Sequence, residues 1–116
     1  MKPEIINGVY DEAARQSFKV NSNSCVSWWI AASYQYYHCN ESLLSDTCYD
    51  NLAKYIKKNF DKISHQHLHL ITKDNLEVGS LYNLKASDYP EIVKNSSEML
   101  VRELLVWRNK NGQNQI

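Results

Sequence analysis

Residues 24–60 run SCVSWWIAASYQYYHCNESLLSDTCYDNLAKYIKKNF and contain neither Gly nor Pro. Residues that favour helix N-caps precede both apolar runs within this stretch: Asn23 or Ser24 precedes the first, and Ser45 precedes the second. We therefore predict a helical hairpin, with one helix over residues 24–38, a polar loop over residues 39–44 and a second helix over residues 46–60.

The first predicted helix is apolar on two faces. A helix of this kind buries one face in the core and offers the other to a pocket or a partner. One stripe holds Val26, Trp29, Ile30, Ser33 and Tyr37, and the other holds Cys25, Trp28, Ala32 and Tyr36. The second predicted helix has a single apolar stripe, which is typical of a helix that covers a core from one side.

The flanking segments complete one small domain over residues 1–116. Residues 10–20 predict a short helix. Residues 61–89 predict a β-hairpin, because apolar and polar side chains alternate from residue 63 and Gly79 interrupts a second short run. Residues 95–109 predict a C-terminal helix, since Asn95 and Glu98 resemble a capping box and Gly112 would end it. The predicted fold class is mainly α, within an α+β arrangement.

Charge and cysteine usage restrict the function classes. Thirteen Lys and Arg balance 13 Asp and Glu over 116 residues, which argues against a nucleic-acid binder. No apolar run is long enough to span a membrane. Residues 1–10 lack a hydrophobic stretch, so we expect no signal peptide. Three cysteines without CxxC spacing suit a reducing compartment. We expect a cytoplasmic protein.

A cluster of aromatic and acidic residues surrounds the predicted hairpin loop. Tyr36 and Tyr37 end the first helix, while Asp46, Tyr49 and Asp50 share one face of the second at i, i+3 and i+4. Flat aromatic faces beside two carboxylates suit a flat cation. Oxidised nicotinamide, a planar pyridinium attached to a ribose, is such a ligand. An aromatic core and a helix cap are the simpler explanation of the same residues.

The pattern Tyr-x-Tyr-Tyr followed by Ser-Asp-x-x-Tyr-Asp-x-Leu resembles the N-terminal helical subdomain of bacterial NAD-dependent DNA ligases over residues 30–58. That subdomain recognises the nicotinamide mononucleotide (NMN) half of NAD. The resemblance implies that the NMN contacts are made by Tyr36, Tyr37, Asp46, Tyr49 and Asp50. It also implies a small phage-type ligase-related protein, acting in the host cytoplasm if it is viral.

We therefore expect non-catalytic binding of a nicotinamide nucleotide, NMN or NAD, in a viral accessory or anti-defence role. No catalytic residue and no required cofactor is predicted. The ligase adenylation motif Lys-x-Asp-Gly is absent from the chain, so we do not expect a ligase. Two alternatives stay open: a protein–protein interaction module that modulates a host defence or DNA-metabolism protein, and a small NAD-processing hydrolase.

Two further groups are candidate sites of other kinds. His65, His67 and His69 would share one face of a strand, where a metal site is less favoured than a solvated surface. Adjacent Trp28 and Trp29 cannot both face the same core layer, so both are candidate interface residues, of which one is expected to mark a protein interface, with burial in a small helical core as the alternative.

Overall fold

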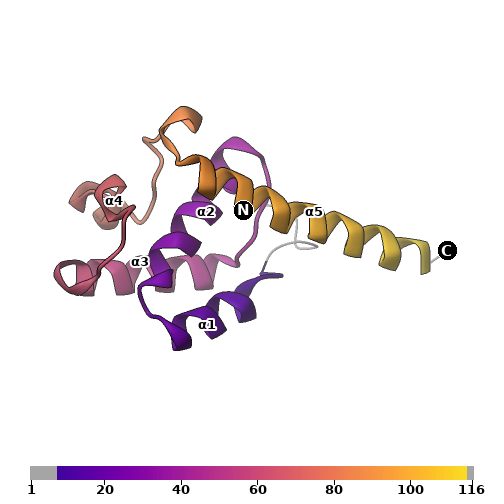
Figure 1. The fold of residues 1–116 in the computed structure, drawn as a ribbon, viewed down its shortest axis with the longest axis horizontal. Helices are drawn as coiled ribbons and strands as arrows, with labels where there is room; N and C mark the ends of the chain where they lie inside the picture. Colours follow the sequence, from indigo (N-terminus) through magenta and orange to yellow (C-terminus); the bar gives the residue numbers. More distant parts are fainter. Residues whose placement is uncertain (1–7, 115–116) are drawn as a thin grey trace.

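Helix α2 (Ser24–His38) lies at the centre of the fold and contacts three other helices. These are α1 (Asp11–Val20), α3 (Asp46–Asn59) and α5 (Glu91–Asn114). The structure is a computed structural model that describes residues 8–114 (Figure 1). It is a single, mainly α domain, as predicted.

Most of α2 is buried because three neighbouring helices pack around it. Cys25, Val26, Trp29 and Ile30 are inaccessible to solvent and form the centre of the core. The predicted helices over residues 10–20, 24–38 and 46–60 are confirmed to within one residue at each end. Ser45 is the N-cap of α3, and its Oγ accepts a hydrogen bond of 3.1 Å from the Cys48 N–H.

The predicted β-hairpin over residues 61–89 is wrong. Between residues 8 and 114 the chain contains no strand, and this segment forms three 3-10 turns and one short helix. These elements are η1 (Phe60–Lys62), η2 (Leu68–Leu70), α4 (Lys73–Val78) and η3 (Ala86–Asp88). Thr72 and Asn75 form a capping box that starts α4, and Gly79 ends it with a φ of 71°. The capping box and Gly79 thus favour a helix over residues 73–78, in place of part of the predicted β-hairpin.

Helix α5 begins earlier than predicted. It starts at Glu91, directly after Pro90, whose carbonyl accepts the first helical hydrogen bonds. The Asn95–Glu98 pair therefore lies inside the helix and does not cap it, and the helix continues past Gly112. In Figure 1, α5 crosses the helical body and its C-terminal part extends beyond the other helices. None of the described helices is both long and apolar enough to cross a lipid bilayer.

Candidate functional site

All five residues predicted to bind a ligand line one cavity of about 210 Å³ at the loop end of the α2–α3 hairpin. Tyr36 and Tyr37 come from the last turn of α2, and Asp46, Tyr49 and Asp50 come from the first turns of α3. The remaining wall, which sequence reasoning did not assign, is formed by Ala32, Ser42, Leu43 and Leu44. Three of those four residues belong to the connecting loop, whose path depends on tertiary packing.

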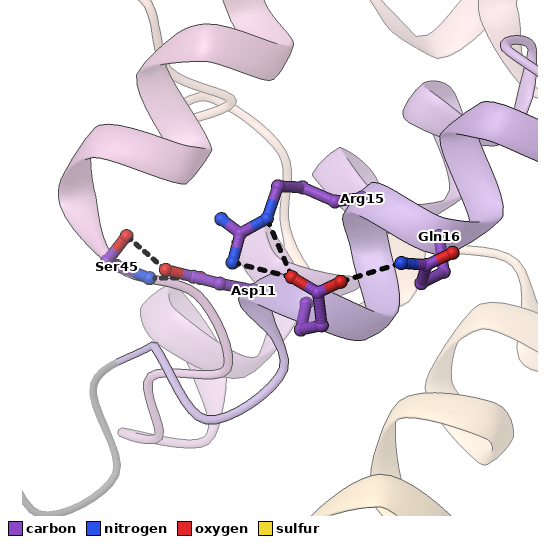
Figure 2. Close-up of polar contacts among 5 residues, drawn as sticks. Asp11, Arg15, Gln16 and Ser45 are labelled. Carbon is purple, nitrogen blue, oxygen red and sulfur yellow. Dashed lines mark hydrogen bonds and ion pairs between the residues drawn. The ribbon is translucent and has the colours of Figure 1, made fainter.

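Two hydrogen bonds anchor the start of α3 and so place its acidic residues. The Asp11 carboxylate accepts hydrogen bonds from the Ser45 N–H at 2.9 Å and from the Ser45 hydroxyl at 2.6 Å (Figure 2). These bonds join α1 to Ser45, the N-cap of α3. Ser45 in turn bonds the Cys48 N–H in the first turn of α3, so the start of this helix is fixed relative to α1. Asp46 and Asp50 are one turn apart on that helix and both open into the cavity.

The aromatic side chains meet at defined angles around the cavity. The rings of Tyr36 and Tyr37 are nearly perpendicular, at 80°, with centroids 5.0 Å apart. The ring of Tyr49 lies against the buried Trp29, at 32° and 5.4 Å. The Tyr37 hydroxyl is hydrogen-bonded to the Ser80 hydroxyl, which ties the end of α2 to the segment after α4. The cavity thus has aromatic walls contributed by both helices of the hairpin.

The Tyr49 hydroxyl points away from the carboxylates, into the core. It lies 2.6 Å from the Ser33 Oγ, and Ser33 donates its own proton to the Trp29 carbonyl at 2.8 Å. Tyr49 is therefore the donor to Ser33. Burial is the main cause that raises the pKa of the Tyr49 phenol above its ordinary value. Tyr49 is consequently neutral at physiological pH, and it offers the cavity an uncharged ring.

The two carboxylates carry the negative charge of the cavity. Asp46 and Asp50 are both exposed, and neither makes an ion pair within the part of the chain that the structure describes. Unpaired carboxylates beside aromatic faces can stabilise a planar cation and accept hydrogen bonds from hydroxyl or amide groups. The arrangement supplies binding groups for such a ligand.

A larger cavity of about 580 Å³ lies between α1 and α3, and the sequence did not predict it. Part of its polar rim is already engaged: Asp11 binds Ser45, and Arg15 forms an ion pair of 3.0 Å with Glu12 (Figure 2). Burial, followed by the nearby Asp11, raises the pKa of the Cys48 thiol to about 11, so Cys48 is a poor nucleophile. The apolar part of the wall is formed by Ala14, Phe18, Leu52 and Tyr55.

The three histidines predicted to share a strand face, with a metal site as the less favoured interpretation, are not on a strand. His65 and His67 have ring centroids 5.5 Å apart, whereas His69 bonds the Gln66 carbonyl through Nδ1 at 3.0 Å. Within residues 8–106 no group of three His, Cys, Asp or Glu side chains is arranged to hold a metal ion. The prediction that the three histidine side chains share one face is wrong, because the chain turns at residues 66–70 and does not form a strand there.

Of the two candidate interface tryptophans, Trp29 is corrected to a core residue. Trp29 is inaccessible to solvent and packs on Tyr49 inside the core. Trp28 is half-buried, and its ring centroid lies 6.2 Å from that of Tyr10. Adjacent helical residues point about 100° apart, which explains the difference. Only Trp28 retains a surface that a partner can reach.

Comparisons of the chain with protein-family models, with curated proteins and with solved structures find no match. The resemblance to the ligase subdomain therefore rests on the residues quoted above. The function is inferred from the geometry of the site.

Proposed function

We propose that this protein binds a nicotinamide nucleotide, NMN or NAD, without transforming it. The observation that carries the proposal is the convergence of three tyrosines and two unpaired carboxylates on one cavity. The positively charged nicotinamide ring occupies that cavity, and Asp50 accepts hydrogen bonds from the ribose. The role proposed for the complex is that of a viral accessory or anti-defence protein.

The energetics favour an oxidised nicotinamide over a neutral ring of the same shape. Stacking on an aromatic side chain contributes about 1–3 kcal/mol, by analogy with nucleic-acid bases. A desolvated cation over a ring adds about 0.5–2 kcal/mol. Because Asp46 and Asp50 add a favourable charge interaction only with a cation, the reduced and uncharged dihydronicotinamide should bind more weakly.

Calorimetry with NMN, NAD, reduced NMN and ADP-ribose tests the proposal. We expect NMN and NAD to bind in the micromolar to millimolar range, reduced NMN to bind more weakly, and ADP-ribose not to bind. Asp50→Ala should weaken NMN binding by about tenfold or more, because it removes a charge-assisted acceptor. Asp61→Ala is the control, since Asp61 is exposed in η1 and does not line the cavity.

If NMN and NAD fail to bind at millimolar concentration, the proposal is wrong. Chromatography of NAD after long incubation with the protein separates binding from hydrolysis. Release of nicotinamide, lost in the Asp50→Ala variant, would favour the small NAD-processing hydrolase instead.

A second candidate function is a protein–protein interaction module that modulates a host defence or DNA-metabolism protein. It is favoured by exposed apolar side chains on α5 that recur every seven residues: Ile92, Met99 and Val106 are 63%, 58% and 59% exposed. Residues seven apart lie on nearly the same side of a helix, so these side chains form one exposed apolar stripe that a partner protein can contact. Affinity capture from a bacterial lysate, compared between the native chain and Met99→Glu, tests this function, with Trp28→Ala as a second variant.

A further inference from the structure

The 210 Å³ cavity is too small for a whole nucleotide. Sites for small-molecule ligands are roughly 300–1,000 Å³ in volume. A ligand whose ring fills this cavity must therefore extend beyond it. A second cavity, of about 240 Å³, lies between α3 and α4, and Asp50 lines both cavities. The rest of the ligand can pass over Asp50 into this neighbouring space.

Two lysines line the second cavity, and only one of them forms an ion pair. The Lys57 Nζ is 3.0 Å from the Glu77 carboxylate, so its charge is compensated. Lys54 also lines this cavity and makes no ion pair with any residue that the structure describes. It lies four residues after Asp50 on α3, which places the two side chains on the same face with Cβ atoms about 5–6 Å apart. That separation is comparable to the length of a ribose.

From this placement we infer that the second cavity is a phosphate subsite, with Lys54 binding the 5′-phosphate of a nicotinamide mononucleotide. The inference rests on the proposed function and assigns the residue that binds the phosphate of its ligand. The ring occupies the tyrosine-lined cavity, the ribose hydroxyls donate to Asp50, and the phosphate reaches Lys54. The preferred ligand is thus a phosphorylated nucleoside.

Nicotinamide riboside, which lacks the phosphate, is the matched probe. In low-salt calorimetry, we expect NMN to bind about 1.5- to fivefold more tightly than the riboside, as for one exposed ion pair. Lys54→Gln should reduce NMN affinity to that of the riboside and leave riboside binding unchanged. Lys58→Gln is the control, because Lys58 is exposed on the same helix but lines neither cavity.

Glu77→Gln is a second variant, and it should change NMN affinity in the opposite direction to Lys54→Gln. It releases Lys57 from its ion pair and should tighten NMN binding without affecting the riboside. Equal affinity of the native protein for NMN and the riboside, or an equal loss for both ligands in Lys54→Gln, would overturn the subsite while leaving the proposed function intact. If neither ligand binds at millimolar concentration, the proposed function fails, and the subsite fails with it.

Discussion

Tyr49 is the residue in which the core and the candidate site meet. Its ring forms part of the cavity wall and packs on Trp29, while its hydroxyl is bonded to Ser33 inside the protein. The side chain therefore has two separable functions. The ring provides a flat surface for a ligand, and the hydroxyl contributes to stability.

Tyr49→Phe separates these two functions. The variant keeps the ring but loses the buried hydrogen bond to Ser33, so the free energy of unfolding should fall by about 0.5–1.5 kcal/mol. NMN affinity should stay nearly unchanged. Urea unfolding and calorimetry on the same preparation measure both effects. Tyr82→Phe is the control, because the Tyr82 hydroxyl bonds Asp74 at the surface and its removal should have little effect on stability. A large loss of NMN affinity in Tyr49→Phe would show that the hydroxyl contacts the ligand.

The segment from Ile63 to Thr72 shows how an element can mislead sequence reasoning. Its alternation suggested a strand, yet the segment folds as turns held by side chains. His65 accepts a hydrogen bond at Nδ1 from the His67 N–H, at 3.0 Å, and its Nε2 lies 2.8 Å from the Ser27 hydroxyl. An imidazole that accepts at Nδ1 is deprotonated there, so these contacts require neutral His65.

This geometry makes the stability of the protein sensitive to mild acid. Burial, followed by the nearby His67, lowers the pKa of His65 below its unfolded value. Because the folded state binds the proton less well, the stabilisation by neutral His65 is fully present above about pH 6.5 and is lost as the pH falls through the folded pKa. The melting temperature should drop between pH 7.5 and pH 5.5, and less so in His65→Gln. His69→Gln, at an exposed position, should retain the native pH dependence; an identical drop in all three proteins would exclude this role for His65.

At the scale of the whole molecule, α5 is attached to α2 by a buried polar contact. The Gln35 side-chain amide donates to the Ser97 hydroxyl at 2.9 Å, and the two residues are 1% and 0% exposed. The Tyr10 hydroxyl adds a second link, to the Leu100 carbonyl at 2.6 Å. These contacts join segments 62 and 90 residues apart. They set the position of α5 against the hairpin.

Ser97→Ala should therefore loosen α5. The substitution removes the acceptor of a buried amide and should lower the free energy of unfolding by about 1–3 kcal/mol. Urea unfolding followed by tryptophan fluorescence measures the change. Ser96→Ala is the matched control: Ser96 is exposed and donates only to carbonyls of its own helix, so its loss should change stability by less than about 0.5 kcal/mol. Equal effects of the two substitutions would contradict a role for Gln35 and Ser97 in holding α5.

The sequence by itself determined the features that arise within one or two helical turns. Ser45 as an N-cap, the bounds of α1, α2 and α3, and the shared face of Asp46, Tyr49 and Asp50 all follow from local spacing, because the interacting groups are at most four residues apart. The convergence of that face with the end of α2 was also predicted, since a short loop forces two helices to lie side by side.

Only the tertiary structure decided what depends on contacts between distant residues. The burial of Gln35 requires Ser97, and the turns after Ile63 are bonded to α2 through Ser27. Which tryptophan enters the core, Trp29 and not Trp28, depends on the helices that surround α2. The second cavity likewise exists only because α4 folds against α3 beside Lys54. Local patterns cannot specify these features, since each is stabilised by a partner whose position the whole fold sets.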